Sequence, residues 1–234
     1  MFGVPLHLNN QDFNSFFLDM KMKFFFLTNL FFLSLSAIAQ KSDLVGVQIG
    51  GMTWMTRNLE ETRFRNGDRI PQAQSDEEWQ EAGFNKKPAW CYYIDYTDSG
   101  PKEVVNRGKL YNSYAVNDPR GLAPEGWHIP TEGEWNLLES KAVLEGKGIV
   151  ELFSKEHWTG VDDGWNVLGL SISPDGWRDV GCGGLDRDVS FWGSTKYDDE
   201  TAVVSFYLDE QSVGAMQYRS TSWIMGYYIR CVKD

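Results

Sequence analysis

The part of the chain past residue 165 most restricts the possible folds. It carries short apolar runs, such as FWGS, AVVSFYL and GYYIRCV, separated by clusters of Gly, Asp and Ser. Runs of this length between turn residues are typical of antiparallel strands and too short for most helices. Helical patterns, by contrast, lie earlier in the chain. The sequence therefore predicts an α+β fold with short helices in the first two thirds and mostly antiparallel strands in the C-terminal part.

Several local signals place elements before that region. Gly50-Gly51 between two apolar runs is a two-residue hairpin signal. Ser75 followed by DEEWQEAG predicts a short helix with a capping serine, acidic residues in the first turn and Gly83 as its stop. Trp90 to Asp95 is typical of a strand, and PKEVVNRGK, residues 101–109, is typical of a loop.

The stretch GWHIPTEGEW, residues 126–135, begins a second helix. Thr131 and Glu134 have the S/T-x-x-E spacing of a capping box, in which each residue binds the backbone amide of the other. Pro130 precedes the cap. The apolar positions that follow support a helix: Trp135, Leu138 and Val143, with Leu137 and Leu144 beside them.

The same stretch contains His128, a possible reaction centre. After residue 39 the chain has two histidines, His128 and His157, and no H-E-x-x-H motif, whereas a zinc site needs three or four ligands. It also lacks the G-x-S-x-G motif of many hydrolases. Because Glu134 is explained by the helix cap, we predict no catalytic residue here.

A leader precedes the domain. Lys21 and Lys23 form a positive region, Phe24–Ser36 is apolar, and Ala37-Ile38-Ala39 is a cleavage signal. The apolar stretch is shorter than the roughly 20 residues that span a bilayer, so we expect a signal peptide cleaved after Ala39 and no stable membrane span.

We therefore expect translation to start at Met20 or Met22, and residues 1–39 to be leader. With no internal repeat and no low-complexity linker, residues 40–234 are predicted to form one domain. The expected location is secreted, at the cell surface or in the periplasm.

Charge and cysteine content narrow the partners and the chemistry. The chain has a net charge of −11, which repels phosphate backbones and argues against nucleic acid as a partner. In an oxidising compartment its three cysteines predict one disulfide and one free thiol among Cys91, Cys182 and Cys231, in a pairing that spacing does not decide.

Two sets of acidic and basic residues stand out. Acidic turns offer oxygen ligands for calcium, the one cofactor considered, although solvated acidic turns are commoner and none matches an EF-hand loop. The turn residues are Asp162, Asp163, Asp186, Asp188, Asp198 and Asp199. Arg178 and Arg230 lie within apolar runs, so we expect both to be structural ion-pair residues.

Five segments resemble, in order and spacing, the Fibrobacter succinogenes major paralogous domain family. They are IGGMTWMTRNL, GKLYNSYAVNDPRGLAPEGWHIPTEGEW, DGWRDVG, FWGST and GYYIRCVKD, and the resemblance runs from about Val45 to Asp234. The family comprises secreted or surface proteins of Bacteroidetes and Fibrobacteres, and their function is largely unassigned.

PTEGEW and RCVKD are also similar to elements of formylglycine-generating-enzyme (sulfatase-modifying factor) domains, which share the C-type-lectin-like fold. That resemblance implies that the C-terminal strand pairs near the N-terminal one.

The departures from these families bear on chemistry. Ala123 stands where relatives carry a cysteine, and a further family cysteine before the G-x-L-Y element is missing. The resemblance thus implies that Cys231 pairs with Cys91 or Cys182 or stays reduced. The close cysteine pair of the oxidase branch and the calcium-site motifs of the sugar-binding branch are both missing, so neither activity carries over.

Aromatic residues suggest a binding role instead. Ten tryptophans and ten tyrosines are many for this length, and such side chains suit sugar rings and protein interfaces. Those within the family segments are expected to pack in the core, including Trp54, Trp127, Trp135, Trp177 and Trp192. The expected ligand contacts lie between the segments: Trp158, Trp165, Tyr197, Tyr218 and Trp223.

We therefore expect a monomeric, exported, non-catalytic binding or surface-interaction module whose ligand is a glycan or a cell-surface protein. The alternative is a structural component of a surface assembly, and an enzyme of the formylglycine-generating type comes third.

Overall fold

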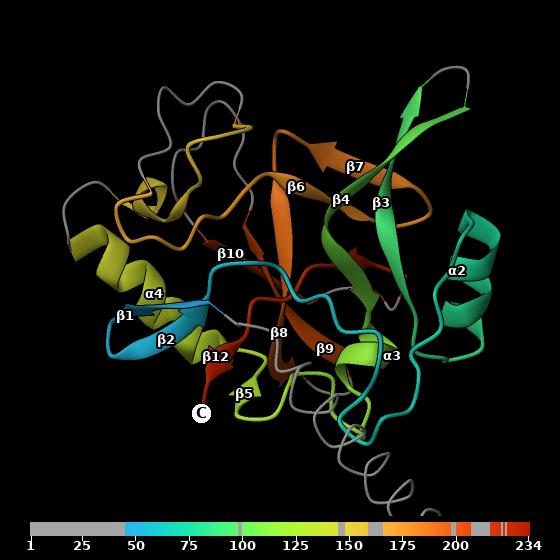
Figure 1. Ribbon diagram of the computed structural model, residues 1–234, viewed down its shortest axis with the longest axis horizontal. Coiled ribbons are helices and arrows are strands. Elements are labelled where there is room, and N and C mark those ends of the chain that lie inside the picture. The colour runs from blue at the N-terminus through green and yellow to red at the C-terminus, as the bar shows by residue number, and fades with distance from the viewer. Residues whose placement is uncertain are drawn as a thin grey trace, which may run out of the picture. The chain divides into compact units, whose positions relative to one another are not determined.

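Strands form most of the structure, a computed structural model drawn in Figure 1. It describes residues 45–97, 100–144, 148–158, 166–197, 200–206, 216–220, 222 and 224–234. Residues 45–234 fold as one compact unit. The described part mixes helices and mostly antiparallel strands, as predicted, and its helices all lie in the first two thirds of the chain.

Helices and strands alternate along the chain without a repeating pattern. They are β1 (Gly46–Ile49), β2 (Met52–Met55), α2 (Asp76–Phe84), β3 (Trp90–Thr97), β4 (Gly100–Asn112), α3 (Ser113–Val116), β5 (Trp127–His128), α4 (Glu132–Leu144), the 3-10 helix η1 (Ile149–Leu152), β6 (Asp175–Arg178), β7 (Cys182–Leu185), β8 (Val189–Tyr197), β9 (Glu200–Phe206), β10 (Met216–Ser220), β11 (Gly226–Tyr227) and β12 (Val232–Lys233).

The strands make two sheets. The smaller has the order β1-β2-β12-β5, and the larger has the order β10-β9-β8-β6-β11-β4-β3, with β7 paired to β6. Within both sheets the strand pairs are antiparallel except for a short parallel contact between β6 and β8. Because β11 lies between β4 and β6, the end of the chain inserts into the middle of the larger sheet.

The two ends of the domain meet in the smaller sheet. The turn between β1 and β2 has positive φ at Gly50 (61°) and Gly51 (85°), a backbone that glycine adopts readily in two-residue hairpins. Val232 of β12 pairs with Trp54 of β2, beside the labelled C-terminus in Figure 1. The expected return of the C-terminal strand to the N-terminal one is therefore confirmed.

The segment 101–109 corrects a sequence prediction. It is not a loop but part of the long strand β4, which pairs with β3 from Thr97↔Gly100 to Trp90↔Tyr111. Its Lys, Glu, Asn and Gly residues have weak strand propensity, but a long hairpin partner supplies the backbone hydrogen bonds, and two register shifts absorb the irregularity.

Both predicted helix starts are confirmed. The Ser75 side chain accepts a hydrogen bond from the Glu78 amide at 3.2 Å, although α2 continues one residue past Gly83. At α4, Thr131 Oγ1 accepts from the Glu134 amide at 3.2 Å, and Glu134 Oε2 accepts from the Thr131 amide at 2.7 Å. The two bonds of the capping box fix where α4 begins.

The core joins α4 to both sheets. The buried face of α4 consists of Trp135, Leu138 and Ala142, whereas Val143, which the spacing had placed inward, is exposed. The indole of Trp135 packs on Trp54 of β2 and Phe191 of β8, with ring centroids 4.8 Å and 5.6 Å apart. One aromatic stack thus links the smaller sheet, the helix and the larger sheet.

The two arginines within apolar runs are both buried, but they are held differently. Arg178 of β6 pairs with Asp76 at the start of α2, as expected of a structural ion pair. Arg230 instead binds an amide side chain and backbone carbonyls, as described below. None of the described helices is long and apolar enough to cross a membrane.

Candidate functional site

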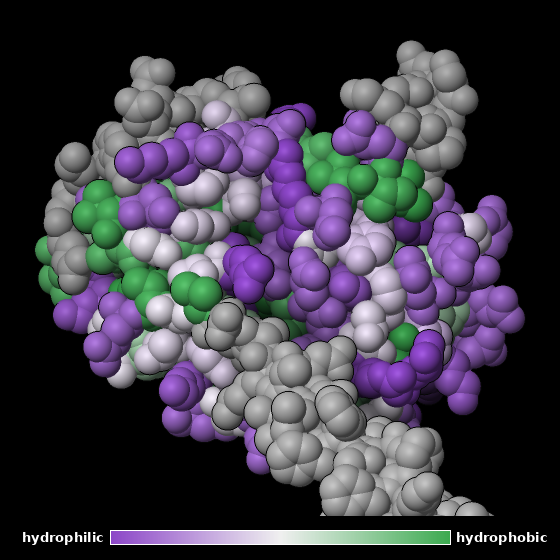
Figure 2. All heavy atoms as spheres, in the orientation of Figure 1, coloured by the Kyte–Doolittle hydropathy of each residue, from purple (hydrophilic) through white to green (hydrophobic). Residues whose placement is uncertain are grey.

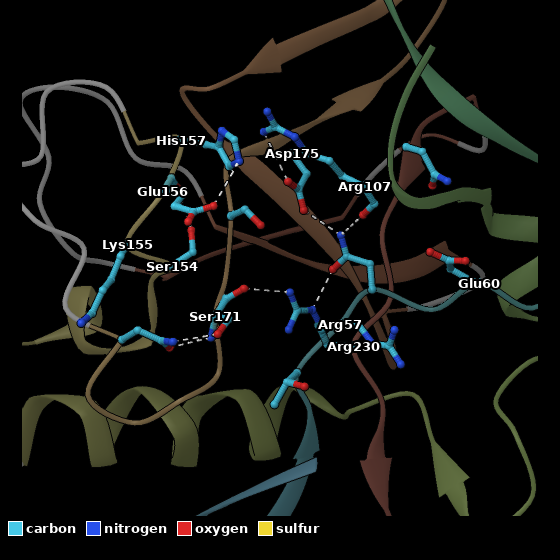
Figure 3. A pocket seen from close by; sticks show the side chains of 15 residues that line it. Arg57, Glu60, Arg107, Ser154, Lys155, Glu156, His157, Ser171, Asp175 and Arg230 are labelled. Atoms are coloured by element: carbon cyan, nitrogen blue, oxygen red, sulfur yellow. Dashed lines mark hydrogen bonds and ion pairs between the residues drawn. The ribbon is translucent and has the colours of Figure 1, made fainter. Parts of the chain in front are cut away.

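A cleft of about 560 Å³ opens beside the larger sheet, and every residue that lines it has a polar side chain (Figure 3). Its lining comes from the segment after β2, from β4, from the chain on either side of residues 159–165, from β6, and from the segment between β11 and β12. The charged residues of this lining are Arg57, Glu60, Arg107, Lys155, Glu156, Asp175 and Arg230. Hydrophilic residues also cover most of the molecular face seen in Figure 2.

A buried polar network forms the floor of the cleft. Arg230, 2% exposed, donates from Nε to Asn58 Oδ1 at 2.7 Å and from Nη1 to the Leu170 carbonyl at 2.8 Å. The Asn58 amide nitrogen then donates to Asp175 Oδ2 at 2.7 Å and to the Arg107 carbonyl at 2.8 Å. Burial lowers the pKa of Arg230 to about 10, and the charge of Asp175 partly opposes that shift.

Asp175 is the residue of this network with an unsatisfied hydrogen-bond acceptor. Its carboxylate is buried, and its Oδ1 atom has no hydrogen-bond partner among the described residues. Arg107 Nη1 lies 3.6 Å from that oxygen, within ion-pair range but beyond a hydrogen bond, and 3.0 Å from Asp186 Oδ1. Burial raises the pKa of Asp175, and the charge of Arg230 and the hydrogen bond from Asn58 only partly offset it.

The rim of the cleft follows η1. Ser154 donates its hydroxyl to the Glu156 carbonyl at 2.8 Å, and His157 adopts φ of 74°, which turns the chain. The imidazole Nε2 atom of His157 lies 3.8 Å from Glu156 Oε2. In Figure 3 the labelled Glu156 and His157 lie across the opening from Glu60.

This arrangement suits hydrogen bonding to a polar ligand. The floor offers one carboxylate oxygen, and the walls offer guanidinium, ammonium, hydroxyl and amide groups, so the cleft contains both donors and acceptors. Within the described ranges, no group of three or more His, Cys, Asp or Glu residues is placed to hold a metal ion.

Of the five aromatic residues expected to contact a ligand, the structure describes the side chain of Trp158. Trp158 is half buried, stacks on Phe153 with centroids 4.5 Å apart, and donates from Nε1 to the Ile172 carbonyl at 3.0 Å, so it packs against the core. Trp165 and Trp223 lie outside the described residues. Tyr197 and Tyr218 belong to β8 and β10, but their side chains are outside the described part.

The acidic turns are only partly described. Asp186 pairs with Arg107, and burial raises the pKa of Asp188 to about 6 against the hydrogen bond from Trp177. Four further positions lie outside the described residues, and calcium binding there stays a prediction: Asp162, Asp163, Asp198 and Asp199.

All three cysteines are free thiols in this structure, so the predicted disulfide is not formed in it. Cys91 and Cys231 are buried, and Cys182 is half buried.

His128 serves the fold, since it lies between two carboxylates. Its Nδ1 atom is 2.7 Å from Asp234 Oδ1, and its Nε2 atom is 2.8 Å from Glu134 Oε1. The imidazole therefore joins β5, the start of α4 and the C-terminal residue. Burial lowers the pKa of His128, but the hydrogen bonds to the two carboxylates outweigh it, and the pKa is raised above its ordinary value of 6.5.

Replacing His128 by glutamine is expected to destabilise the protein in a pH-dependent way. Because the pKa of His128 is raised in the folded state, its contribution to the free energy of unfolding is fully present below pH 6.5. That contribution is lost as the pH rises through the raised pKa. The Glu134 pKa is lowered, because hydrogen bonds from Thr131 and His128 outweigh burial, so its contribution is present above pH 4.5 and lost as the pH falls through the lowered pKa.

Urea unfolding of the His128→Gln variant should therefore show the largest loss of stability between pH 4.5 and 6.5, the ordinary values of the two groups, and a smaller loss at alkaline pH. His157→Gln, on a half-exposed rim residue, is the control and should cost less stability than His128→Gln. A loss for His128→Gln that is the same at acidic and alkaline pH would contradict the assignment.

Sequence reasoning missed the residues of the cleft floor. Asn58 and Asp175 both lie in segments that carried the family resemblance, TRNL and DGWRD, but neither was singled out. Arg107 was placed in a loop. The available signal was polar residues at the ends of apolar strand patterns, where side chains from different strands converge.

These observations define a class of protein. It is an α+β domain in which the C-terminal strand pairs with an N-terminal one, and it carries a cleft lined by polar residues. The chain belongs to the Fibrobacter succinogenes major domain family, whose family model matches residues 47–233. No curated protein and no solved structure matches this chain.

Proposed function

We propose that this protein is an exported, monomeric, non-catalytic binding module with a C-type-lectin-like fold, and that it holds a glycan in the polar cleft. A glycan on the cell surface or a glycosylated surface protein would present the same hydroxyl-rich chemistry. Export rests on the Lys21-Lys23, apolar and A-x-A pattern of the leader.

The observation that carries this proposal is the unmet acceptor in an entirely polar cleft. A buried carboxylate oxygen without a hydrogen-bond donor is costly, and a ligand hydroxyl can donate to Asp175 Oδ1 while its oxygen accepts from Arg107. Sugars carry many such paired groups. The lining residues all have polar side chains, which favours a ligand rich in hydroxyl groups.

Binding of polysaccharides and glycans to the chain should depend on the cleft. With a glycan array run in calcium and in chelator, we expect at least one carbohydrate to bind, and titration calorimetry of that carbohydrate should show an affinity about tenfold lower for Arg107→Gln. Lys155→Gln, on the exposed rim, should weaken binding less and leave the fold intact.

The matched control is Arg69→Gln, which removes a similar charge from an exposed residue outside the cleft lining. Because Arg107 also pairs with Asp175 and Asp186, each variant is checked by thermal unfolding before binding is measured. Full affinity in folded Arg107→Gln and Lys155→Gln would contradict the cleft as the site. Calcium dependence would point to the acidic turns.

Assembly into a surface structure is the second candidate. It is favoured by three exposed apolar side chains of α4: Leu137, Val143 and Leu144. If no carbohydrate on the array binds and the protein self-associates in sedimentation experiments, this function would be supported over glycan binding.

A further inference from the structure

Two of the three thiols lie beside one buried arginine. The guanidinium of Arg178, 1% exposed, has its Nη1 atom 3.8 Å from Cys91 Sγ. Burial raises the pKa of the Cys182 thiol, and the charge of Arg178 partly opposes that rise. Burial raises the pKa of the Cys91 thiol, and the nearby Cys182 raises it further. Cys91 and Cys182 therefore share one small polar site inside the larger sheet.

The strands that carry the two cysteines are neighbours. β7 lies alongside β3, and the Ile94 amide of β3 donates to Cys182 Sγ at 3.3 Å. Arg178 of β6 pairs in register with Cys182 of β7, which places the guanidinium at the junction of the three strands. In Figure 1, β7 crosses near the upper part of β3 and β4.

Cys231 lies elsewhere. It precedes β12, and its carbonyl accepts from the Met55 amide at 2.9 Å. Burial raises the pKa of its thiol, and the charges of Glu61, Arg65 and Asp234 also act on that pKa. Among the described residues, Cys91 and Cys182 are instead influenced by Arg178 and Asp76. The three-way ambiguity of the sequence thus reduces to one spatial pair.

We propose that Cys91 and Cys182 are a modification site, the pair that forms a disulfide when the protein meets a thiol-disulfide oxidant, and that Cys231 stays reduced. The bridge would join β3 to β7. It would also fix the turn that follows β7, in which Asp186 holds Arg107.

The reaction balances with a disulfide-bearing oxidant such as oxidised glutathione or a thiol oxidoreductase. Cys182, the more exposed thiol, loses its proton and attacks a sulfur of the oxidant, which releases one thiol and leaves a mixed disulfide. Cys91 then loses its proton and displaces the second thiol. The two cysteines give up two electrons and two protons, and the oxidant disulfide is reduced to two thiols.

Disulfide formation between Cys91 and Cys182 is expected to be slow but possible. Burial raises the pKa of the Cys91 thiol to about 12, and the Arg178 charge partly opposes that rise, so the guanidinium stabilises the attacking thiolate at the second step. The absence of the bridge from the free-thiol structure is consistent with a reduced state of the same site.

The test is made on the full chain, reduced and then incubated with oxidised glutathione. After denaturation and alkylation, we expect three alkylated cysteines in the reduced sample and one in the oxidised sample, with a digest peptide joining Cys91 to Cys182. Cys231→Ala should still form the bridge, and Cys182→Ser should not. Oxidation should raise Tm by roughly 5–10 °C in the wild type and not in Cys182→Ser.

Two results would overturn the proposal. One is three freely alkylated cysteines after oxidation of the folded protein. The other is a cross-linked peptide that contains Cys231. Glycan binding is measured separately on the same samples, so a missing bridge leaves the cleft proposal standing, and a missing ligand leaves the bridge standing.

Discussion

Replacing Arg230 by methionine is expected to lower the free energy of unfolding by about 3–5 kcal/mol, because it removes the cation from a buried polar network that also contains the Asp175 carboxylate. The methionine fills most of the volume but leaves Asn58 Oδ1 and the Leu170 carbonyl without this donor, and it removes a cation that favours the charged form of Asp175. Guanidinium unfolding should show a lower midpoint with an unchanged slope.

Lys233→Met is the matched control, since Lys233 is an exposed cation three residues further along the chain. It should change stability by less than about 0.5 kcal/mol. The double variant Asp175→Asn with Arg230→Met tests the cause, because removing both charges should cost less than the sum of the single losses. A midpoint for Arg230→Met equal to that of the wild type would contradict the role of the network.

Replacing Trp135 by alanine is expected to lower the free energy of unfolding by about 3–5 kcal/mol as well, through loss of packing and the cavity left behind. The indole is fully buried between Trp54 and Phe191, so it contributes to the contact of α4 with both sheets. Urea unfolding measured by circular dichroism tests the loss without relying on tryptophan fluorescence.

Leu137→Ala is the matched control on the same helix. Leu137 lies two residues further along α4 and is 58% exposed, so its truncation removes a similar apolar group without opening a cavity. The expected loss is below about 0.5 kcal/mol. Equal losses for the two variants would mean that the helix, and not the aromatic stack, limits stability.

The network that stabilises the domain is also the floor of the cleft. Asn58 and Asp175 connect strands that are distant in sequence, and the same side chains present the acceptor that a ligand would use. Variants of the floor therefore alter stability and binding together. The exposed rim, with Lys155 as its clearest position, allows binding to be changed while the fold is kept.

Local chemistry explains the parts of the fold that could be predicted. The hairpin at Gly50-Gly51, the Ser75 cap and the capping box of Thr131 and Glu134 depend on residues within four positions of one another. Such interactions are present in the sequence itself. The strand at residues 101–109 was missed because its pairing with β3 outweighs weak intrinsic propensity.

The candidate site depended on contacts that no local pattern contains. Arg230 and Asn58 meet across 172 positions, and Asn58 and Asp175 meet across 117. The position of Arg178 beside both Cys91 and Cys182 likewise follows from the pairing of β6 with β7 and the packing of β7 on β3.

The sequence by itself thus determined the family, the α+β class, the helix starts and the hairpin, because hydrogen bonds and turn geometry over a few residues decide them. The tertiary structure alone decided which polar side chains converge in the cleft and which two thiols share an arginine. Those contacts form only when strands from opposite ends of the chain pair. The packing of the whole core selects that pairing.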